Sequence, residues 1–304
     1  MKKRRISLVL LLGILLGVVS LGITLYPLIG NYLSEKTKST VLTEYAQTVE
    51  TLEDERIREM LAAAQVYNNA LTPGALSMEN VFSRAGQALA AEDYYDLLTV
   101  SSDGIMGYVE IPKIAVYLPI YHGTENDVLN VGIGHLIGSS LPIGGESTHS
   151  VLTGHSGMAR ERMFSDLDQL HLGDQFYLKV LDQTLAYEVD QIKIVLPDNT
   201  DYLGIEKGQD YCSLVTCTPF GVNTHRLLVR GHRVEYTEST DETIQEIDDN
   251  AAPVVSTWQQ QYIKGLMIAI VILIVSIILS RMTIFRRRGK HEARPSQRPA
   301  KNHR

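Results

Sequence analysis

The sequence changes character at Gly104, and this change restricts the possible folds more than any other feature. Beyond it, short β-branched and aromatic runs alternate with Gly and Pro, as in strands joined by turns. Many short strands of this kind, without an internal repeat, predict a mostly β fold, either a closed barrel or a sandwich. The expected strands are Gly107–Ile111, Ala115–Ile120, Ser150–Thr153, Gln175–Val180, Leu185–Leu196, Cys212–Cys217 and Leu227–Val234, with short helical inserts at Asp127–Val131 and Arg160–Leu167.

The region before Gly104 has a helical period instead. From Ser34 to Ala70, apolar residues recur mostly at steps of three and four, and Leu71-Thr72-Pro73-Gly74 ends the pattern. We therefore expect N-terminal helices in residues 30–103. A β-barrel domain follows over 104–238, and then a linker over 239–262.

Two apolar stretches lie near the ends of the chain, at 6–29 and 263–285. The first would measure about 36 Å as a helix, enough for a hydrocarbon core of about 30 Å. Basic clusters at 1–5 and 286–304 flank them on the terminal sides. The positive-inside rule then predicts a two-pass membrane protein with both termini cytoplasmic and 30–262 outside. Because the basic residues lie beside these stretches and the net charge is −7, we expect no nucleic-acid partner.

The chain has two cysteines, Cys212 and Cys217. On one strand they would point to opposite faces, about 16 Å apart, which is too far for a disulfide. A free thiol outside the cell usually has a use. We expect Cys217 to provide it and Cys212 to be a small buried residue.

Two local patterns carry the chemistry. Thr153-Gly154-His155-Ser156-Gly157 directly follows a predicted strand, so His155 should lie at a strand end. In Thr216-Cys217-Thr218-Pro219-Phe220-Gly221-Val222-Asn223-Thr224-His225-Arg226, Cys217 ends one strand and Arg226 begins the next. A thiol and a guanidinium that flank one turn can meet, and a histidine at the same barrel rim can join them.

Each of the three side chains would supply what the others lack. A free thiol has a pKa of about 8.5, so it is mostly protonated at neutral pH. His155 can take that proton and later protonate a leaving amine. Arg226 stays charged and cannot be a base, but its N–H donors suit an oxyanion or a substrate carbonyl.

These segments resemble the sortases, and among them the class C, pilus-assembling group. His155 in T-G-H, Cys217 in T-C-T-P and Arg226 nine residues later match that family's catalytic residues, and the stretch Tyr94–Ile114 and the second apolar stretch also resemble class C. The resemblance implies a closed eight-stranded β-barrel flanked by two transmembrane helices. It also implies that an L-P-x-T-G-like sorting signal is cleaved through a thioacyl enzyme, and that the acyl group passes to a lysine amine of a pilin.

One feature departs from that group. Class C enzymes often carry an Asp-Pro-aromatic lid over the active site, and no Asp-Pro pair precedes the barrel here. The nearest counterpart is Glu79-Asn80-Val81-Phe82. We therefore predict a more accessible active site than in relatives with a lid.

Alternatives remain for the site residues and for the function. His225 neighbours Arg226 and should face the other way, and Arg230 should lie about 13 Å further along the strand, so both are expected to be structural. No Cys/His/Asp/Glu cluster has metal-site spacing, so we expect no metal and no cofactor. Besides a pilus sortase, the chain could be a housekeeping sortase, a non-catalytic pilin-binding scaffold, or an L,D-transpeptidase using His122. The last reading predicts His122, rather than His155, beside Cys217.

Overall fold

The computed structural model describes residues 8–71, 94–101, 104–156, 163–236, 263–268 and 270–271. The chain divides into two compact units, Met1–Val254 and Val255–Arg304. In the second unit, the described residues 263–268 and 270–271 are helical.

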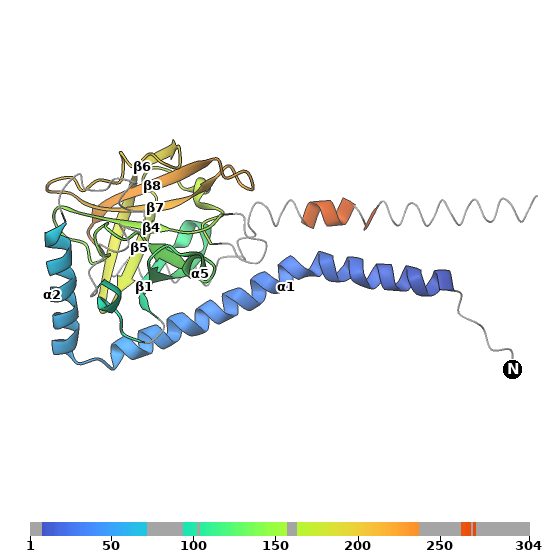
Figure 1. Cartoon of the computed structure of the whole chain (residues 1–304), viewed down its shortest axis with the longest axis horizontal. Coiled ribbons are helices and arrows are strands. Elements are labelled where there is room, and N and C mark those ends of the chain that lie inside the picture. The colour runs from blue at the N-terminus through green and yellow to red at the C-terminus, as the bar shows by residue number, and fades with distance from the viewer. Residues whose placement is uncertain are drawn as a thin grey trace, which may run out of the picture. The chain divides into compact units, whose positions relative to one another are not determined.

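The first unit contains a closed β-barrel (Figure 1), with the strand order β1-β2-β3-β4-β7-β8-β6-β5. Most neighbours are antiparallel, but β2–β3 and β4–β7 are parallel pairs. The strands are β1 (Ile105–Ile111), β2 (Val116–His122), β3 (Ile133–His135), β4 (Thr148–Thr153), β5 (Gln175–Val180), β6 (Gln183–Val195), β7 (Asp210–Thr218) and β8 (His225–Val234).

The closed eight-stranded barrel is confirmed, and all seven predicted strands are present, most of them longer than expected. β3 was missed because three residues are too few to show an alternating pattern. The insert predicted at Asp127–Val131 is the helix α5 (Asn126–Leu129). The helix predicted at Arg160–Leu167 is wrong over its described part. Met163 has a φ of 40°, outside the helical region, and a turn there leads into the 3₁₀ helix η3 (Leu167–Gln169).

The helical region before the barrel contains two helices, α1 (Leu8–Glu50) and α2 (Asp54–Ala70), and the break between them interrupts the helical pattern of Ser34–Ala70. The break lies in the charged stretch Glu50–Glu59, whose side chains would also fit the solvated face of one continuous helix. Glu53 is extended, and Asp54 and Glu55 occupy the first turn of α2, where acidic side chains favour a new helix start.

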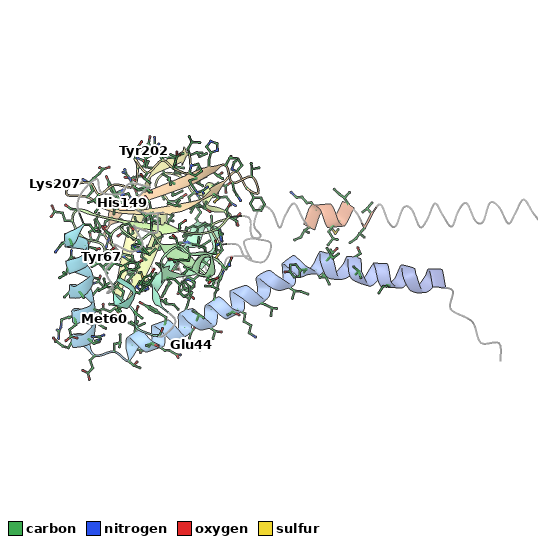
Figure 2. The ribbon with its side chains drawn as sticks, in the orientation of Figure 1. Glu44, Met60, Tyr67, His149, Tyr202 and Lys207 are labelled. Carbon is green, nitrogen blue, oxygen red and sulfur yellow. The ribbon has the colours of Figure 1, made fainter. Side chains whose placement is uncertain are left out.

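Both helices are bonded to the barrel. The Tyr45 hydroxyl of α1 donates to the Met106 carbonyl and accepts from the Leu181 N–H, each over 2.9 Å. On α2, Asn68 bonds the backbone of Leu141 through both ends of its amide. Figure 2 shows Met60 and Tyr67 on the barrel side of α2, and Met60 is 7% exposed.

None of the helices in the described parts of the chain has both the length and the apolar character needed to cross a membrane. Much of the predicted second span at 263–285 and the whole basic tail lie outside the described residues. The lid-like segment Glu79–Phe82 also lies outside them.

Buried apolar side chains form two clusters on opposite faces of the barrel wall. The larger one fills the interior and extends to side chains of α1 and α2, and on β7 and β8 it includes Cys212, Leu214, Leu227 and Val229. A smaller cluster lies on the outer face of β4, β7 and β8, beneath the β6–β7 connection. It consists of Leu136, Val151, Val195, Leu203, Val215 and Leu228. Because strand residues alternate between faces, the outer cluster fixes which side chains of β7 and β8 face outward.

Candidate active site

The turn between β7 and β8 brings the predicted thiol and guanidinium together. Cys217 is the direct cross-strand partner of Arg226 in the antiparallel β7–β8 pair. Both continue the outward-facing rows of Val215 and Leu228. Directly opposite residues of such a pair have Cβ atoms about 5 Å apart, so the two side chains share one small area of the outer face.

β4 delivers His155 to the same place. β4 runs parallel to β7 and is paired with it up to Thr153 and Val215. Beyond that pair, the Gly154 N–H donates to the Val215 carbonyl over 3.0 Å, and the Thr216 hydroxyl donates to the Gly154 carbonyl over 2.8 Å. His155 therefore emerges beside the end of β7.

Two further features hold this segment in place. The Ser156 hydroxyl donates to the Cys217 carbonyl over 2.7 Å and so joins the residue after His155 to the backbone of the thiol. A Cβ atom at position 154 would lie 2.9 Å from the Phe164 ring, closer than such atoms approach, so glycine is required there. The T-G-H pattern thus has a packing reason as well as a chemical one.

Cys217, His155 and Arg226 line one pocket with a volume of about 290 Å³. Its floor is largely the outer apolar cluster, and the connection between β6 and β7 supplies another wall. The other lining residues are Thr124, Leu129, Leu136, Val151, Thr153, Gly154, Pro197, Asn199, Thr200, Leu203, Val215, Thr216 and Leu228. An apolar hollow with a few polar groups at one end suits an extended peptide with apolar side chains.

His155 is half-buried, and its partial removal from water lowers the pKa of its imidazole below the usual 6.5. The charged form is disfavoured, so the ring is neutral at neutral pH. A neutral imidazole can accept a proton from a thiol, which is the task of a general base.

Arg226 keeps most of its hydrogen-bonding capacity. Its Nη1 donates to the carbonyls of His225 (3.1 Å) and Asn223 (3.4 Å), both in the adjoining turn. Among the described residues, no carboxylate forms an ion pair with its guanidinium. The remaining N–H donors can reach a ligand in the pocket.

The competing histidine and arginine residues lie elsewhere. His122 is absent from the pocket lining, and its ring nitrogens lie 3.1 Å from the Gly104 carbonyl and 2.7 Å from the Leu97 carbonyl. The expectation of the L,D-transpeptidase reading is therefore not met. His225 bonds the Thr224 hydroxyl outside the pocket, and Arg230 is paired with Asp190.

The second cysteine occupies the environment expected of it. Cys212 is fully buried in the barrel interior, where burial raises the pKa of its thiol well above the usual value, and both cysteines are free. In the described part of the chain, no three His, Cys, Asp or Glu side chains gather as metal ligands would.

Sequence reasoning missed the supporting residues of the pocket. Thr216 and Ser156 lie beside the expected Cys217 and His155, so their hydroxyls could have been considered as backbone anchors. The β6–β7 connection lines the pocket through Pro197, Asn199, Thr200 and Leu203. These residues belong to no motif, and only the closed barrel brings them to the site, so no signal in the sequence pointed to them.

Comparisons with known proteins point in one direction. The sortase domain family matches residues 109–234. Sortase C1 of Streptococcus agalactiae is 45% identical, with a TM-score of 0.58, over 65% of this chain and 100% of that structure. A pilus-related sortase C of Group B Streptococcus is 43% identical, with a TM-score of 0.57, over 64% and 97%. Sortase D of Bacillus subtilis is 36% identical over 42% of this chain, and the chain spans 63% of its length.

Proposed function

The chain belongs to the sortase family of cysteine transpeptidases, with class C pilus sortases as its structural neighbours, and on this premise we propose its reaction. Cys217 attacks the Thr–Gly bond of an L-P-x-T-G-like sorting signal. The resulting thioacyl enzyme passes its acyl group to a lysine amine of a pilin subunit. The products are an isopeptide bond between two pilins and the released C-terminal fragment of the first.

The proposed steps use all three site residues. His155 accepts the thiol proton as Cys217 Sγ bonds to the threonine carbonyl carbon. Arg226 donates N–H groups to the oxyanion, and the protonated His155 gives its proton to the departing glycine amine. The lysine amine then attacks the thioester, a second tetrahedral intermediate collapses, and the thiolate leaves. His155 receives the proton that the amine loses.

One observation carries the proposal: a thiol, a half-buried imidazole and a guanidinium line a single pocket whose floor is apolar. The floor suits the Leu-Pro part of a sorting signal, and the polar end suits the bond that is cut. A non-catalytic scaffold would not require these three groups together.

The choice of a pilin lysine as the acceptor is supported by the similarity to the sortase C structures. A housekeeping sortase would instead pass the acyl group to an amine of peptidoglycan. The test is a competition. The full chain is incubated with a sorting-signal peptide, a pilin-derived lysine peptide and a peptidoglycan-stem amine, and mass spectrometry identifies the product. We expect the lysine isopeptide, and its absence in the presence of the stem product would favour the housekeeping function.

We further propose that the enzyme is membrane-anchored through residues 6–29 and 263–285, with the barrel outside the cell. The proposal rests on the apolar sequence of these stretches and on the basic residues at their terminal sides. A cysteine placed in 286–304 should resist an impermeant thiol reagent in intact cells. Its labelling from outside would contradict this topology.

A further inference from the structure

The β6–β7 connection, residues 196–209, forms one wall of the pocket through Pro197, Asn199, Thr200 and Leu203. Leu203 is 5% exposed and belongs to the outer apolar cluster. A wall built from a connection, rather than from a strand, needs something to hold it against the barrel.

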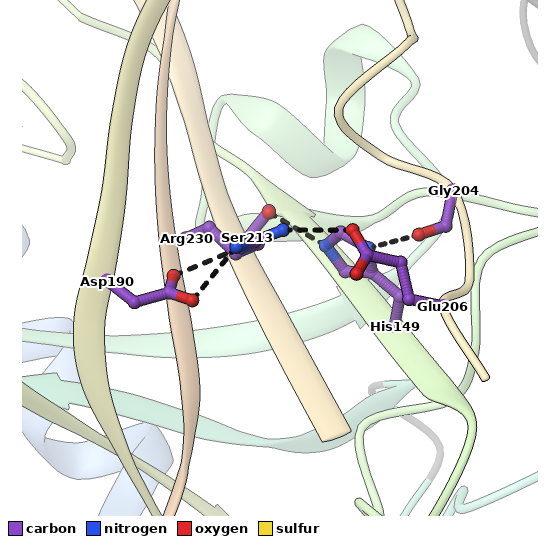
Figure 3. A network of polar contacts seen from close by, with 6 residues as sticks. All are labelled: His149, Asp190, Gly204, Glu206, Ser213 and Arg230. Atoms are coloured by element: carbon purple, nitrogen blue, oxygen red, sulfur yellow. Dashed lines mark hydrogen bonds and ion pairs between the residues drawn. The ribbon is translucent and has the colours of Figure 1, made fainter. Parts of the chain in front are cut away.

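His149, on β4, provides such a hold (Figure 3). Its side chain is fully buried between β7 and the connection. Nδ1 lies 2.9 Å from the Gly204 carbonyl, and Nε2 lies 2.8 Å from the Ser213 hydroxyl. Gly204 is the immediate neighbour of the pocket residue Leu203, so the bond acts directly on the wall.

The two partners of the ring fix the proton on one of its nitrogens. A carbonyl can only accept, so Nδ1 must carry the proton that it donates to Gly204. Nε2 then has a free lone pair, to which the Ser213 hydroxyl can donate. Burial lowers the pKa of His149 to about 4, so the ring is neutral at neutral pH and is the Nδ1–H tautomer.

Arg230 contributes a second, weaker hold. Its guanidinium binds both oxygens of Asp190 over 3.0 and 2.9 Å and stacks 3.9 Å above the Tyr211 ring. From that fixed position, Nη1 reaches Glu206 of the connection over 3.3 Å. The Glu206 side chain is 59% exposed, so this ion pair adds little to the hold of His149.

We propose that His149 is a positioning residue that fixes the pocket wall through the Gly204 carbonyl and thereby sets the affinity for the sorting signal. The inference rests on the proposed transpeptidase function. His149 does not line the pocket and does not touch Cys217, so it acts on binding and leaves the chemical step unchanged.

The test compares His149→Leu with His149→Asn in the full chain. Leu removes the donor to Gly204, whereas Asn can offer an N–H close to the position of Nδ1. We expect His149→Leu to raise KM for a sorting-signal peptide roughly five- to tenfold, the effect of losing one buried hydrogen bond, with kcat within about twofold. His149→Asn should restore most of the affinity.

His135→Gln is the matched control for simple loss of stability. His135 is also fully buried, and its ring contacts the Tyr94 hydroxyl (2.7 Å) and the Ser140 carbonyl (2.9 Å), neither of them in the connection or the pocket lining. It should lower the melting temperature and leave KM unchanged. An equal rise in KM in both variants, or an unchanged KM in His149→Leu, would overturn the proposal.

Hydrogen exchange separates this inference from the proposed function. Amide protons of residues 200–206 should exchange faster in His149→Leu than in the wild-type chain and in His135→Gln. This measurement needs no substrate. Unchanged exchange would therefore show that His149 does not fix the β6–β7 connection against the barrel. Absence of turnover in the wild-type chain, together with the expected exchange, would overturn the proposed function alone.

Discussion

β4, β7 and β8 carry a similar set of side chains at two levels of the outer face. At the rim are His155, Cys217 and Arg226, and further down are His149, Ser213 and Arg230. Cys217 pairs across the strands with Arg226, and Ser213 pairs with Arg230 in the same way.

The two levels differ in what the side chains bond to. At the lower level, each polar group has a protein partner: His149 bonds Gly204 and Ser213, and Arg230 bonds Asp190 and Glu206. At the rim, the hydrogen bonds that Arg226 donates within the described part of the chain go to carbonyls of its own turn, and the His155 ring has no hydrogen-bond partner among the same residues. Similar residue types thus hold the fold at one level and remain available to a substrate at the other.

The two cysteines of β7 give the largest expected contrast. Cys217→Ala should abolish both cleavage and transfer, because no other group at the rim can form the acyl intermediate. Cys212→Ala removes a buried sulfur from the interior, so it should cost about 1 kcal/mol or more of stability and leave the rate nearly unchanged. Turnover and urea unfolding of both variants measure the contrast. A catalytically active Cys217→Ala would end the proposed mechanism.

The histidine at the rim should be almost as important as the thiol. His155→Ala removes both the acceptor of the thiol proton and the donor to the leaving amine, so kcat/KM should fall by about 100- to 10,000-fold. His149→Asn, at the lower level, should leave kcat within about twofold. Equal losses of kcat in the two variants would contradict the assignment of His155 as catalytic and of His149 as a residue that only positions the pocket wall.

Arg226→Lys tests the guanidinium. Lysine keeps the charge but loses the planar set of donors, so the rate should fall by about 100- to 1,000-fold, the usual effect of losing an oxyanion donor. Alkylation of Cys217 should survive largely intact, because the thiol and His155 remain. Arg230→Lys should instead lower stability with a small effect on kcat. Near-normal transfer by Arg226→Lys would move the oxyanion role to backbone N–H groups, because Arg230 is paired with Asp190 outside the pocket.

Acid should lower the stability of the folded chain through two buried histidines, His149 at the lower level and His135 in the interior. Burial lowers the pKa of His135 and His149 from 6.5 to about 4, so the unfolded chain binds more protons between these values. Stability should therefore be complete above about pH 6.5 and fall as the pH drops toward 4, by up to about 3 kcal/mol per histidine. Urea unfolding between pH 8 and 4.5 measures this pH dependence of the unfolding free energy. In His149→Asn the contribution of His149 should be absent and that of His135 should remain. An unchanged pH dependence would contradict the buried, neutral state of His149.

Sequence alone predicted the parts that depend on local patterns. The short strands predicted a barrel or a sandwich, and the resemblance to the sortases implied the closed eight-stranded barrel that is present. The meeting of Cys217 with Arg226 follows from the turn between them. The break between α1 and α2 was missed because its charged residues also fit an exposed helix face. The pocket wall at 196–204 and the bond from His149 to Gly204 were missed because they join segments far apart in the sequence.

The position of the thioacyl bond tests the central claim most directly. The full chain is mixed with a sorting-signal peptide without an acceptor amine, quenched in acid and digested, and the acylated peptide is located by mass spectrometry. We expect the acyl group on Cys217 alone, with Cys212 unmodified, and we expect no adduct in His155→Ala on the same timescale. An adduct on any other residue, or product formed at the normal rate without an adduct on Cys217, would contradict the account.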